Sequence, residues 1–369
     1  MNPSHSSRPL VAIACGGTGG HLFPGLAVAR QLRQRGCDVA LLISPKEVDQ
    51  QAVKAVQDME VFTLPAVGLQ NRNYFSFARS FGQSFCAARK IFRRRPPAAV
   101  LAMGGFTSAP PVLAAKKFHA KKFLHESNTI PGKANRFLAP RVDAAFVGFP
   151  ETAARLRARS VAATGTPVRA QFSPDTRPSA SASACRQALG LAPDRPTVLV
   201  VGGSQGACGL NNLVLFALPL LAAKNWQWLH LAGAGDFERV RAEYARLNLK
   251  AVVKPFLAEM DWALGAATAG VSRAGASSLA EIAALRVPSV LVPLPTAADN
   301  HQFFNAQAFE KTGAARRLEQ NQVSPETMAA VLTELIENDA ARSAMQTALA
   351  RWHSPAAAAQ IAEKILAAL

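Results

Sequence analysis

Three short apolar segments of this chain each end in a pair of glycines and lead into residues with a helical pattern. They are PLVAIAC before GGTGGH (residues 9–21), AAVLAM before GG (98–105) and TVLVV before GG (197–203). A buried strand, a glycine turn and a helix begin a βαβ unit, because glycine permits the sharp turn. Repetition of this unit predicts parallel sheets that carry helices on both faces.

Further strands and helices alternate along the chain. Strands are predicted at residues 39–43, 122–125, 144–147, 228–231, 269–272 and 289–292, and helices at 25–35, 111–118, 208–222, 277–285 and 302–311. A segment rich in Pro, Ser and Ala (164–187) reads as a hinge, and 369 residues exceed one ordinary core. We therefore expect an α/β protein with two doubly wound domains, 1–167 and 168–354. They would face each other across a cleft that holds ligands at the carboxyl ends of the strands.

The glycine spacing argues against several classes of nucleotide-binding protein. G-x-G-x-x-G is broken at residues 16–22 and 202–208, and G-x-x-x-x-G-K-[ST] is absent, unlike nicotinamide dehydrogenases and P-loop NTPases. The chain lacks Asp-x-Asp, with which many glycosyltransferases hold a metal, and its five cysteines show no metal-ligand spacing. The sequence therefore predicts no metal and no cofactor, so that backbone dipoles and arginine neutralise any bound diphosphate.

The balance of charge requires an acidic partner. The chain has 41 Lys and Arg against 24 Asp and Glu, a net charge of +17. Residues 71–96 mix aromatic with basic side chains, which predicts an amphipathic surface that binds an anionic membrane. A second interpretation has the phenylalanines facing the core and the arginines solvated. Nucleic-acid binding is a third, but it leaves the glycine loops unexplained, so we expect no nucleic-acid partner.

Polar residues follow predicted strands of the second domain at the edge where ligands bind. Ser204 and Gln205, in the second glycine loop, are able to hydrogen-bond phosphate oxygens. Glu281 lies in the first two turns of a helix that starts near Ala276. A carboxylate there either accepts hydrogen bonds from both hydroxyls of a ribose or provides a favourable charge near the helix N-terminus. Gln302 begins another helix and either reads sugar hydroxyls or has a surface or capping role.

Seven segments in this order resemble the MurG family of glycosyltransferases. They are GGTGGH (16–21), GGFTSAP (104–110), LHESNTIPGKAN (124–135), GTPVR (165–169), GGSQGA (202–207), SRAGASSLAE (272–281) and NHQFFNA (300–306). The resemblance spans nearly the whole chain. It implies a GT-B architecture of two Rossmann-like domains, with a last helix (355–369) that packs back on the first domain.

The same resemblance implies an activity and a location. The implied reaction is an inverting transfer of N-acetylglucosamine from UDP-N-acetylglucosamine to the C4 hydroxyl of the muramoyl sugar of undecaprenyl-linked lipid I. The product would be lipid II, for peptidoglycan synthesis. We expect a peripheral protein on the cytoplasmic face of the inner membrane, with cell-wall assembly proteins as possible partners. A GT-B transferase acting on another lipid acceptor, such as diacylglycerol, is the alternative enzyme.

Roles for single residues are also implied by the resemblance. Donor contacts are implied for Thr18, Gly19 and Gly20 and for Asn128 of HESN, while Arg169 and Ser204 approach the diphosphate. The residues implied to hold uracil and ribose are Leu257, Ala276, Ser277, Ser278, Leu279, Ala280 and Glu281, and Gln302 reads the sugar beside His301. Three positions depart from the family pattern: Phe106 replaces the tyrosine of GGY, Ser127 replaces the glutamine of HEQN, and the neighbours of Arg273 differ.

His21, on the lip of the first glycine loop, is the candidate general base. An inverting transfer needs a group that takes the proton of the acceptor hydroxyl, which typically contributes ~10²–10⁴-fold. The positive end of the helix dipole disfavours imidazolium, so we expect a neutral His21 that is able to accept a proton. The alternative is the adjacent pair His125 and Glu126, as acid–base residues or as support for the acceptor site.

Overall fold

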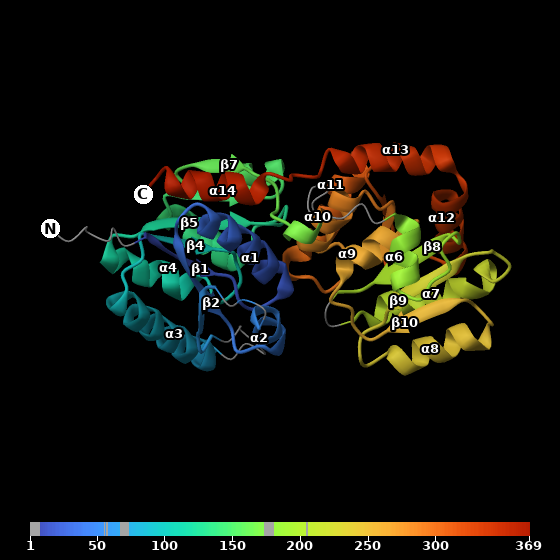
Figure 1. Ribbon diagram of the computed structural model, residues 1–369, viewed down its shortest axis with the longest axis horizontal. Coiled ribbons are helices and arrows are strands. Elements are labelled where there is room, and N and C mark those ends of the chain that lie inside the picture. The colour runs from blue at the N-terminus through green and yellow to red at the C-terminus, as the bar shows by residue number, and fades with distance from the viewer. Residues whose placement is uncertain (1–7, 55, 57, 67–73, 173–180, 204–205) are drawn as a thin grey trace. The chain divides into compact units, whose positions relative to one another are not determined.

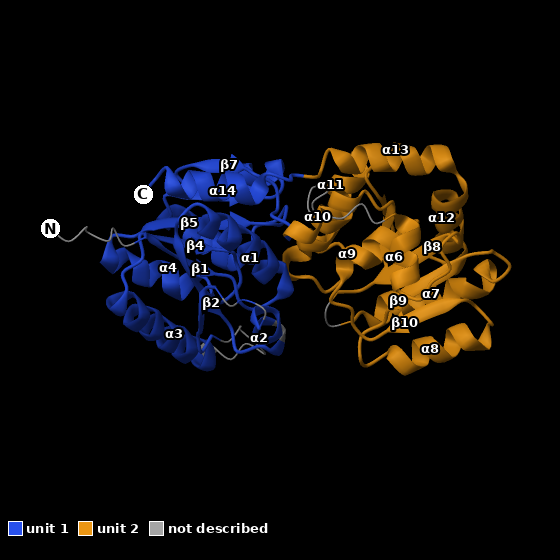
Figure 2. Ribbon diagram, in the orientation of Figure 1, with its two compact units in different colours: residues 1–169, 354–369 blue, residues 170–353 orange. Residues whose placement is uncertain are grey.

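A computed structural model describes residues 8–54, 56, 58–66, 74–172, 181–203 and 206–369 of the chain (Figure 1). The chain divides into two compact units (Figure 2). The first unit holds residues 1–169 together with 354–369, and the second unit holds residues 170–353. The predicted boundary after residue 167 falls close to this division.

In the described part of the first unit, seven parallel strands form one sheet in the order β3-β2-β1-β4-β5-β6-β7. They are β1 (Leu10–Ala14), β2 (Asp38–Ile43), β3 (Glu60–Thr63), β4 (Ala99–Ala102), β5 (Lys121–Glu126), β6 (Ala144–Val147) and β7 (Val161–Ala163). The strand order reverses at β1, which pairs with β2 and with β4. The loops after β1 and β4 therefore leave the sheet at the switch point, where open parallel sheets bind ligands.

Helices cover both faces of this sheet, as Figure 1 shows. They are α1 (Gly19–Gln34), α2 (Glu47–Val53), α3 (Tyr74–Arg94), α4 (Ala109–Ala115), α5 (Lys133–Leu138) and α14 (Ala357–Leu366). Successive strand residues point to opposite faces. Leu10 and Ala12 of β1 accordingly lie in one core with Phe92 of α3, whereas Val11 and Ile13 lie in the other core.

The last helix belongs to the first unit although it ends the chain. α14 lies beside α1 (Figure 1). Ile361 and Ile365 of α14 are fully buried in the same core as Leu22 of α1. Arg35, at the end of α1, forms an ion pair of 3.0 Å with Glu363. The helix that the family resemblance implied over residues 355–369 is thus observed from Ala357 to Leu366.

The described residues of the second unit repeat this plan with six parallel strands, in the order β10-β9-β8-β11-β12-β13. The strands are β8 (Thr197–Val201), β9 (Gln227–Leu231), β10 (Ala251–Lys254), β11 (Ala269–Ser272), β12 (Ser289–Leu291) and β13 (Arg316–Arg317). The helices are α6 (Ala182–Ala188), α7 (Cys208–Leu221), α8 (Phe237–Arg246), α9 (Met260–Ala266), α10 (Ala276–Leu285), α11 (His301–Lys311), α12 (Pro325–Glu337) and α13 (Asp339–Ala350). The predicted doubly wound α/β architecture is confirmed in both units.

α3 has features of two interpretations of residues 71–96: some phenylalanines face the core, and one is exposed. Phe92 is fully buried, and Phe81 and Phe85 pack against the core, so these rings follow the interpretation in which the phenylalanines face the core. Phe75, in contrast, is 81% exposed. Residues 71–73 lie outside the described part of the chain. Among the helices that the structure describes, none is both long enough and apolar enough to span a bilayer.

Candidate active site

The first glycine loop follows β1 and carries His21 in the first turn of α1. Thr18 precedes the helix with extended backbone, at φ −157° and ψ 156°. Its side chain makes no capping hydrogen bond to the helix. Instead, Oγ1 of Thr18 lies 3.0 Å from Nδ1 of His21. Thr18 therefore orients the imidazole ring through Nδ1.

His21 lies against the two glycines that follow β4. Gly104 and Gly105 have positive φ angles of 105° and 74°. A Cβ atom at Gly104 would lie 3.0 Å from Nε2 of His21, and a Cβ atom at Gly105 would lie 3.1 Å from Nδ1. Both the backbone conformation and the close approach of the ring therefore require glycine. The GG pair of GGFTSAP forms one wall of the His21 site.

Glu126 folds the loop after β5 around its carboxylate, which is 3% exposed. Oε1 accepts hydrogen bonds from the backbone N (2.9 Å) and Nδ2 (3.1 Å) of Asn128. Oε2 accepts from the backbone N of Gly132 and from Nδ2 of Asn135, each over 2.9 Å. Four donors compensate the burial of this charge. Glu126 thus shapes the loop that presents Asn128 rather than facing a reacting group.

His125 is fully buried, and both ring nitrogens are hydrogen-bonded. Nε2 lies 3.1 Å from the carbonyl oxygen of Gly165, which accepts only, so Nε2 carries the proton. Nδ1 then accepts from the hydroxyl of Ser127 over 3.3 Å. Burial lowers the pKa of His125, although the Gly165 contact and the Glu126 charge oppose this shift. A neutral, enclosed imidazole is a structural group, so we do not assign acid–base chemistry to His125.

Asn135 is a residue of this site that the sequence analysis did not single out. It is 2% exposed, and its Nδ2 donates to the carbonyl oxygen of His125 over 3.0 Å as well as to Glu126. A Cβ atom at Gly104 would lie 3.4 Å from the same Nδ2. Asn135 therefore connects the HESN loop to the wall of the His21 site. The sequence feature that could have pointed to Asn135 is its place at the end of the LHESNTIPGKAN segment.

The ring of Phe23, in α1, contacts Arg169, where the chain leaves the first unit. The guanidinium carbon of Arg169 lies 4.4 Å from the ring centre of Phe23. A Cβ atom at Gly19 would lie 3.2 Å from the same ring. Gly19 and Gly20 are the first two residues of α1. The structure thus places Thr18, Gly19, Gly20 and Arg169 around one helix start.

The second glycine loop follows β8 and leads into α7. Gly203 and Gly206 have positive φ angles of 99° and 76°. A Cβ atom at Gly206 would lie 3.0 Å from the carbonyl oxygen of Ala232, so this loop runs close to the end of β9. The two predicted phosphate ligands Ser204 and Gln205 lie outside the described residues.

A buried hydrogen-bond network lies behind this loop, and sequence reasoning missed it. Nε2 of His230 lies 3.0 Å from Oδ1 of Asn211, and Nδ1 lies 3.1 Å from Oη of Tyr244. An amide oxygen only accepts, so Nε2 carries the proton and Nδ1 accepts from the tyrosine. Burial lowers the pKa of His230 to about 3. The histidine is therefore neutral and orients Asn211 on the first turn of α7.

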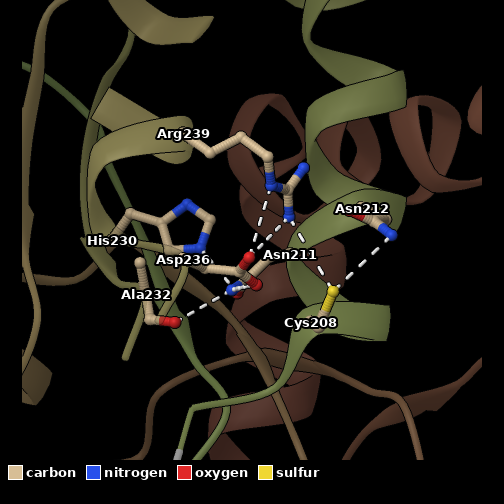
Figure 3. Close-up of polar contacts among 7 residues, drawn as sticks. All are labelled: Cys208, Asn211, Asn212, His230, Ala232, Asp236 and Arg239. Atoms are coloured by element: carbon tan, nitrogen blue, oxygen red, sulfur yellow. Dashed lines mark hydrogen bonds and ion pairs between the residues drawn. The ribbon is translucent and has the colours of Figure 1, made fainter. Parts of the chain in front are cut away.

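Figure 3 shows how this network continues from Asn211 to Asp236 and Arg239. Nδ2 of Asn211 donates to the carbonyl oxygen of Ala232 (2.9 Å) and to Oδ2 of Asp236 (2.8 Å). Burial opposes ionisation of Asp236, but hydrogen bonds from Asn211 and Arg239 hold its pKa below the usual range. Nη2 of Arg239 also lies 4.0 Å from Sγ of Cys208. The network fixes the start of α7 and, with it, the exit from the second glycine loop.

α10 begins at Ala276, as the sequence predicted, directly after the loop that follows β11. Ala276 and Leu279 are buried, whereas the remaining predicted contacts of this helix are half-buried: Ser277, Ser278, Ala280 and Glu281. Leu257 follows β10 and is 7% exposed. These residues therefore lie at the carboxyl ends of β10 and β11, at the edge of the sheet that binds ligands.

Gln302 connects two loops at the same edge. Its Oε1 accepts from the backbone N of Ala274 (3.3 Å) and of Leu294 (3.0 Å). Since Oε1 already accepts two hydrogen bonds, Nε2 is the group of Gln302 suited to a sugar hydroxyl. His301 beside it donates Nδ1–H to the carbonyl oxygen of Ala298 over 2.8 Å. Gln302 thus has a structural as well as a candidate binding role.

Arg273 ends β11 as a guanidinium that is 7% exposed. It donates to the carbonyl oxygens of Val292 (3.1 Å) and Pro293 (3.2 Å) and to Oε1 of Gln320 (2.6 Å). Burial lowers the pKa of this group. Arg273 thus binds the loop after β12, a contact that no sequence motif predicts.

Each unit therefore carries a group of polar residues on the carboxyl edge of its own sheet. In the first unit this group surrounds His21, and in the second it surrounds the start of α10 and Gln302. No three His, Cys, Asp or Glu side chains of the described residues cluster in a way suited to a metal ion. Proton transfer is a reaction that an imidazole at this edge of the sheet is able to perform.

Two family profiles match the chain. Residues 11–147 match the glycosyltransferase family 28 N-terminal domain, and residues 197–364 match the glycosyltransferase family 28 C-terminal domain. Among solved structures, MurG of Acinetobacter baumannii superimposes with a TM-score of 0.75 at 28% identity, over 98% of this chain and 99% of that one. The calicheamicin glycosyltransferase CalG4 superimposes with a TM-score of 0.65 at 18% identity, a likeness of fold alone. Both units together therefore have the GT-B architecture.

Curated relatives are similar over almost the whole chain. A protein of Anaeromyxobacter dehalogenans is 36% identical over 361 residues, which cover 95% of this chain and 91% of the relative. A protein of Halorhodospira halophila is 39% identical over 334 residues, which cover 88% of this chain and 89% of the relative. Each relative is named a UDP-N-acetylglucosamine–N-acetylmuramyl-(pentapeptide) pyrophosphoryl-undecaprenol N-acetylglucosamine transferase.

Proposed function

The chain belongs to the MurG family of glycosyltransferases, and on that premise we propose that His21 is the base of its transfer reaction. The enzyme moves N-acetylglucosamine from UDP-N-acetylglucosamine to the muramyl sugar of lipid I, which gives lipid II for peptidoglycan synthesis. The acceptor C4 hydroxyl attacks the anomeric carbon, the bond from that carbon to the UDP oxygen breaks, and the hydroxyl proton passes to the base. UDP leaves as the second product.

The orientation of the His21 ring is the observation that supports this assignment. Oγ1 of Thr18 lies 3.0 Å from Nδ1, and a Cβ atom at Gly104 would lie 3.0 Å from Nε2. His125, in contrast, is enclosed and uses both ring nitrogens in hydrogen bonds. Glu126 and His125 are therefore proposed to support the acceptor site, and Asn128, on the same loop, is proposed to contact the donor.

Most of the proposed donor contacts are residues of the second unit. Glu281, half-buried on α10, accepts both ribose hydroxyls, and Leu257 with Ala276 lines the uracil site. Nε2 of Gln302 donates to the transferred sugar. Arg169, with Ser204 and Gln205 of the second glycine loop, neutralises the diphosphate. Backbone N–H groups at a helix start and arginine supply this neutralisation without a metal, so we propose that the reaction needs no cofactor.

Charge distribution supports a membrane-facing role of the first unit. This unit contains 25 Lys and Arg against nine Asp and Glu, whereas the second unit contains 16 against 15. Phe75 on α3 and Phe137 on α5 are 81% and 44% exposed, and Arg141 lies 4.2 Å over the ring of Phe137. Exposed aromatics among basic groups suit the interface of an anionic bilayer. We therefore propose peripheral binding to the cytoplasmic face of the inner membrane through α3 and its neighbours.

One assay tests the acceptor and the metal together. Labelled N-acetylglucosamine is offered from its UDP donor to a lipid I analogue in the presence of a chelator, with diacylglycerol and no acceptor in parallel reactions. We expect product on the lipid I analogue alone. Transfer to diacylglycerol would contradict the proposed acceptor, and transfer that appears only after a divalent ion is added would contradict the metal-free mechanism.

A further inference from the structure

Asp49 is a fully buried carboxylate in contact with the first glycine loop. It lies on α2, and its Oδ2 accepts three hydrogen bonds. The donors are the backbone N of Gly17 (2.6 Å), the backbone N of Ser44 (3.1 Å) and the hydroxyl of Ser44 (2.5 Å). One oxygen therefore joins the loop after β1 to the loop after β2. The mechanism proposed above makes no use of this group.

The burial of Asp49 is incompletely compensated. Its Oδ1 is buried and has no hydrogen-bond partner among the described residues, and no ion pair between described residues includes Asp49. Burying a carboxylate without a cation costs free energy, which its hydrogen bonds offset only in part. The three hydrogen bonds that its carboxylate accepts from described residues come from the two loops at the carboxyl edge of the sheet. Its contribution is therefore to hold these loops in place.

The first glycine loop, which Asp49 contacts, also packs closely against residues that follow β2 and β4. A Cβ atom at Gly16 would lie 2.2 Å from the backbone N of Ser44, and one at Gly17 would lie 3.1 Å from the Phe106 ring. Thr107 Oγ1 donates to the carbonyl oxygen of Gly16 over 2.7 Å. The loop is thus held at its carbonyl oxygen by Thr107 and at its next N–H group by Asp49.

Gly17 is followed by Thr18, whose hydroxyl orients His21. We propose that Asp49 is a positioning residue for the transfer reaction: it holds Gly17 and, through it, keeps the Thr18 hydroxyl where it orients the His21 ring. This inference rests on the proposed role of His21 as the base. A small displacement of a positioned catalytic group lowers the rate of the chemical step without changing the binding of a substrate elsewhere.

Asp49→Asn tests this role, because it keeps the shape of the side chain and removes the charge that strengthens the Gly17 hydrogen bond. We expect kcat to fall about 10- to 100-fold, with a much smaller change in the donor KM, because Leu257, Glu281 and Gln302, the proposed contacts to uracil, ribose and sugar, lie on other segments. The double variant Asp49→Asn with His21→Ala should have the kcat of His21→Ala alone, because residues that act as a unit are not additive. A general loss of folded enzyme would instead multiply the two effects.

The outcomes separate the two proposals. If His21→Ala keeps wild-type kcat, the base assignment and the Asp49 role both fail. If His21→Ala is slow but Asp49→Asn is as fast as the wild type, only the Asp49 role fails. The same holds if the double variant is slower than His21→Ala by the full factor that Asp49→Asn causes alone. Asp143→Asn is the matched control, since this aspartate of the first unit also accepts from a backbone N, that of Lys122 over 2.7 Å; it should leave kcat unchanged.

A second variant covers the case in which Asp49→Asn does not fold, which binding of UDP-N-acetylglucosamine and the thermal midpoint will reveal. Ser44→Ala removes one donor to Oδ2 and leaves the other two in place. We expect kcat to fall about threefold, the scale of one net hydrogen bond. Combined with His21→Ala, Ser44→Ala should not lower kcat any further. Wild-type kcat in Ser44→Ala would overturn the proposal.

Discussion

Nε2 of His125 donates a hydrogen bond to the carbonyl oxygen of Gly165 over 3.1 Å. The chain leaves the first unit after Arg169 and returns to it at Ser354. Gly165 has a φ angle of 79°, and a Cβ atom there would lie 2.2 Å from Oγ of Ser354. The segment that leaves the first unit therefore contacts both the HESN loop and the returning segment at Gly165. This explains why GTPVR begins with a glycine.

Gly165→Ala should destabilise the protein by more than the backbone strain alone. The left-handed conformation costs a non-glycine residue about 1–2 kcal/mol, and the clash with Ser354 adds to it because both atoms are confined. Urea unfolding of the variant measures the sum. Gly36→Ala is the control, since Gly36 has a φ angle of 85° but no atom within 4 Å of the added Cβ. Equal losses in the two variants would contradict the packing of Ser354 on Gly165.

His230 makes stability depend on pH with a definite sign. Its pKa is lowered to about 3 in the folded protein, whereas an exposed histidine titrates near 6.5. As pH falls below about 6.5, the unfolded chain binds a proton that the folded chain does not. Stability therefore decreases by about 1.4 kcal/mol per pH unit from this group, and the decrease ends near the folded pKa.

His230→Gln isolates this contribution. We expect the variant to be less stable at pH 7, because a buried network is broken, but to lose less stability between pH 6.5 and 4.5 than the wild type. Urea unfolding at several pH values gives both slopes. Parallel slopes would show that His230 is not buried in its neutral form.

Glu281→Ala tests the ribose contact. Loss of hydrogen bonds to a charged group costs about 1.5–3 kcal/mol, so we expect the donor KM to rise about 10- to 150-fold with a smaller change in kcat. Glu238→Gln on α8 is the control; this exposed carboxylate pairs with Arg241 over 2.6 Å and should leave the donor KM unchanged. An unchanged donor KM in Glu281→Ala would rule out the ribose role.

The positions of His21, Glu281 and Gln302 were predictable because parallel strands end at one edge of a sheet. A glycine loop or a helix start that follows a strand in the sequence must lie at that edge. The doubly wound fold was predictable for the same reason: alternating strands and helices have few other solutions. Sequence order alone carries this information.

The partners of buried polar groups were not predictable. Asp49 belongs to none of the motifs in the sequence, yet its carboxylate accepts a hydrogen bond from the backbone N of Gly17, 32 residues away along the chain. His125 reads as a reactive neighbour of Glu126, but contact with Gly165 makes it structural. These assignments depend on which loops meet in space, which no spacing within one motif reveals.

The start of α1 shows how packing overrides local propensity. Glycine and proline disfavour helix interiors, so the sequence predicted a helix from residue 25, whereas α1 begins at Gly19. A Cβ atom at Gly25 would lie 2.6 Å from Cβ of Cys15. The glycine thus lets the helix lie close to the end of β1, and this contact offsets the unfavourable propensity.

Two exposed phenylalanines, one in each unit, test the membrane-binding surface. Phe75 on α3 is 81% exposed in the unit that carries the excess of basic residues, and Phe216 on α7 is 67% exposed in the nearly neutral unit. Burying a phenylalanine is worth about 1.5–3 kcal/mol, so Phe75→Ser should weaken binding to vesicles containing anionic lipid by roughly tenfold or more. Phe216→Ser should leave that binding unchanged.

Salt and lipid charge separate the electrostatic part of this binding from the apolar part. Screening shortens the reach of the basic residues, so higher salt should weaken the wild type and Phe75→Ser by the same factor. Vesicles of neutral lipid should bind both proteins weakly, because each basic residue near an anionic surface contributes about 1 kcal/mol. Vesicle co-sedimentation over a range of salt measures these factors. If Phe75→Ser and Phe216→Ser weaken binding equally, α3 is not the membrane-binding surface.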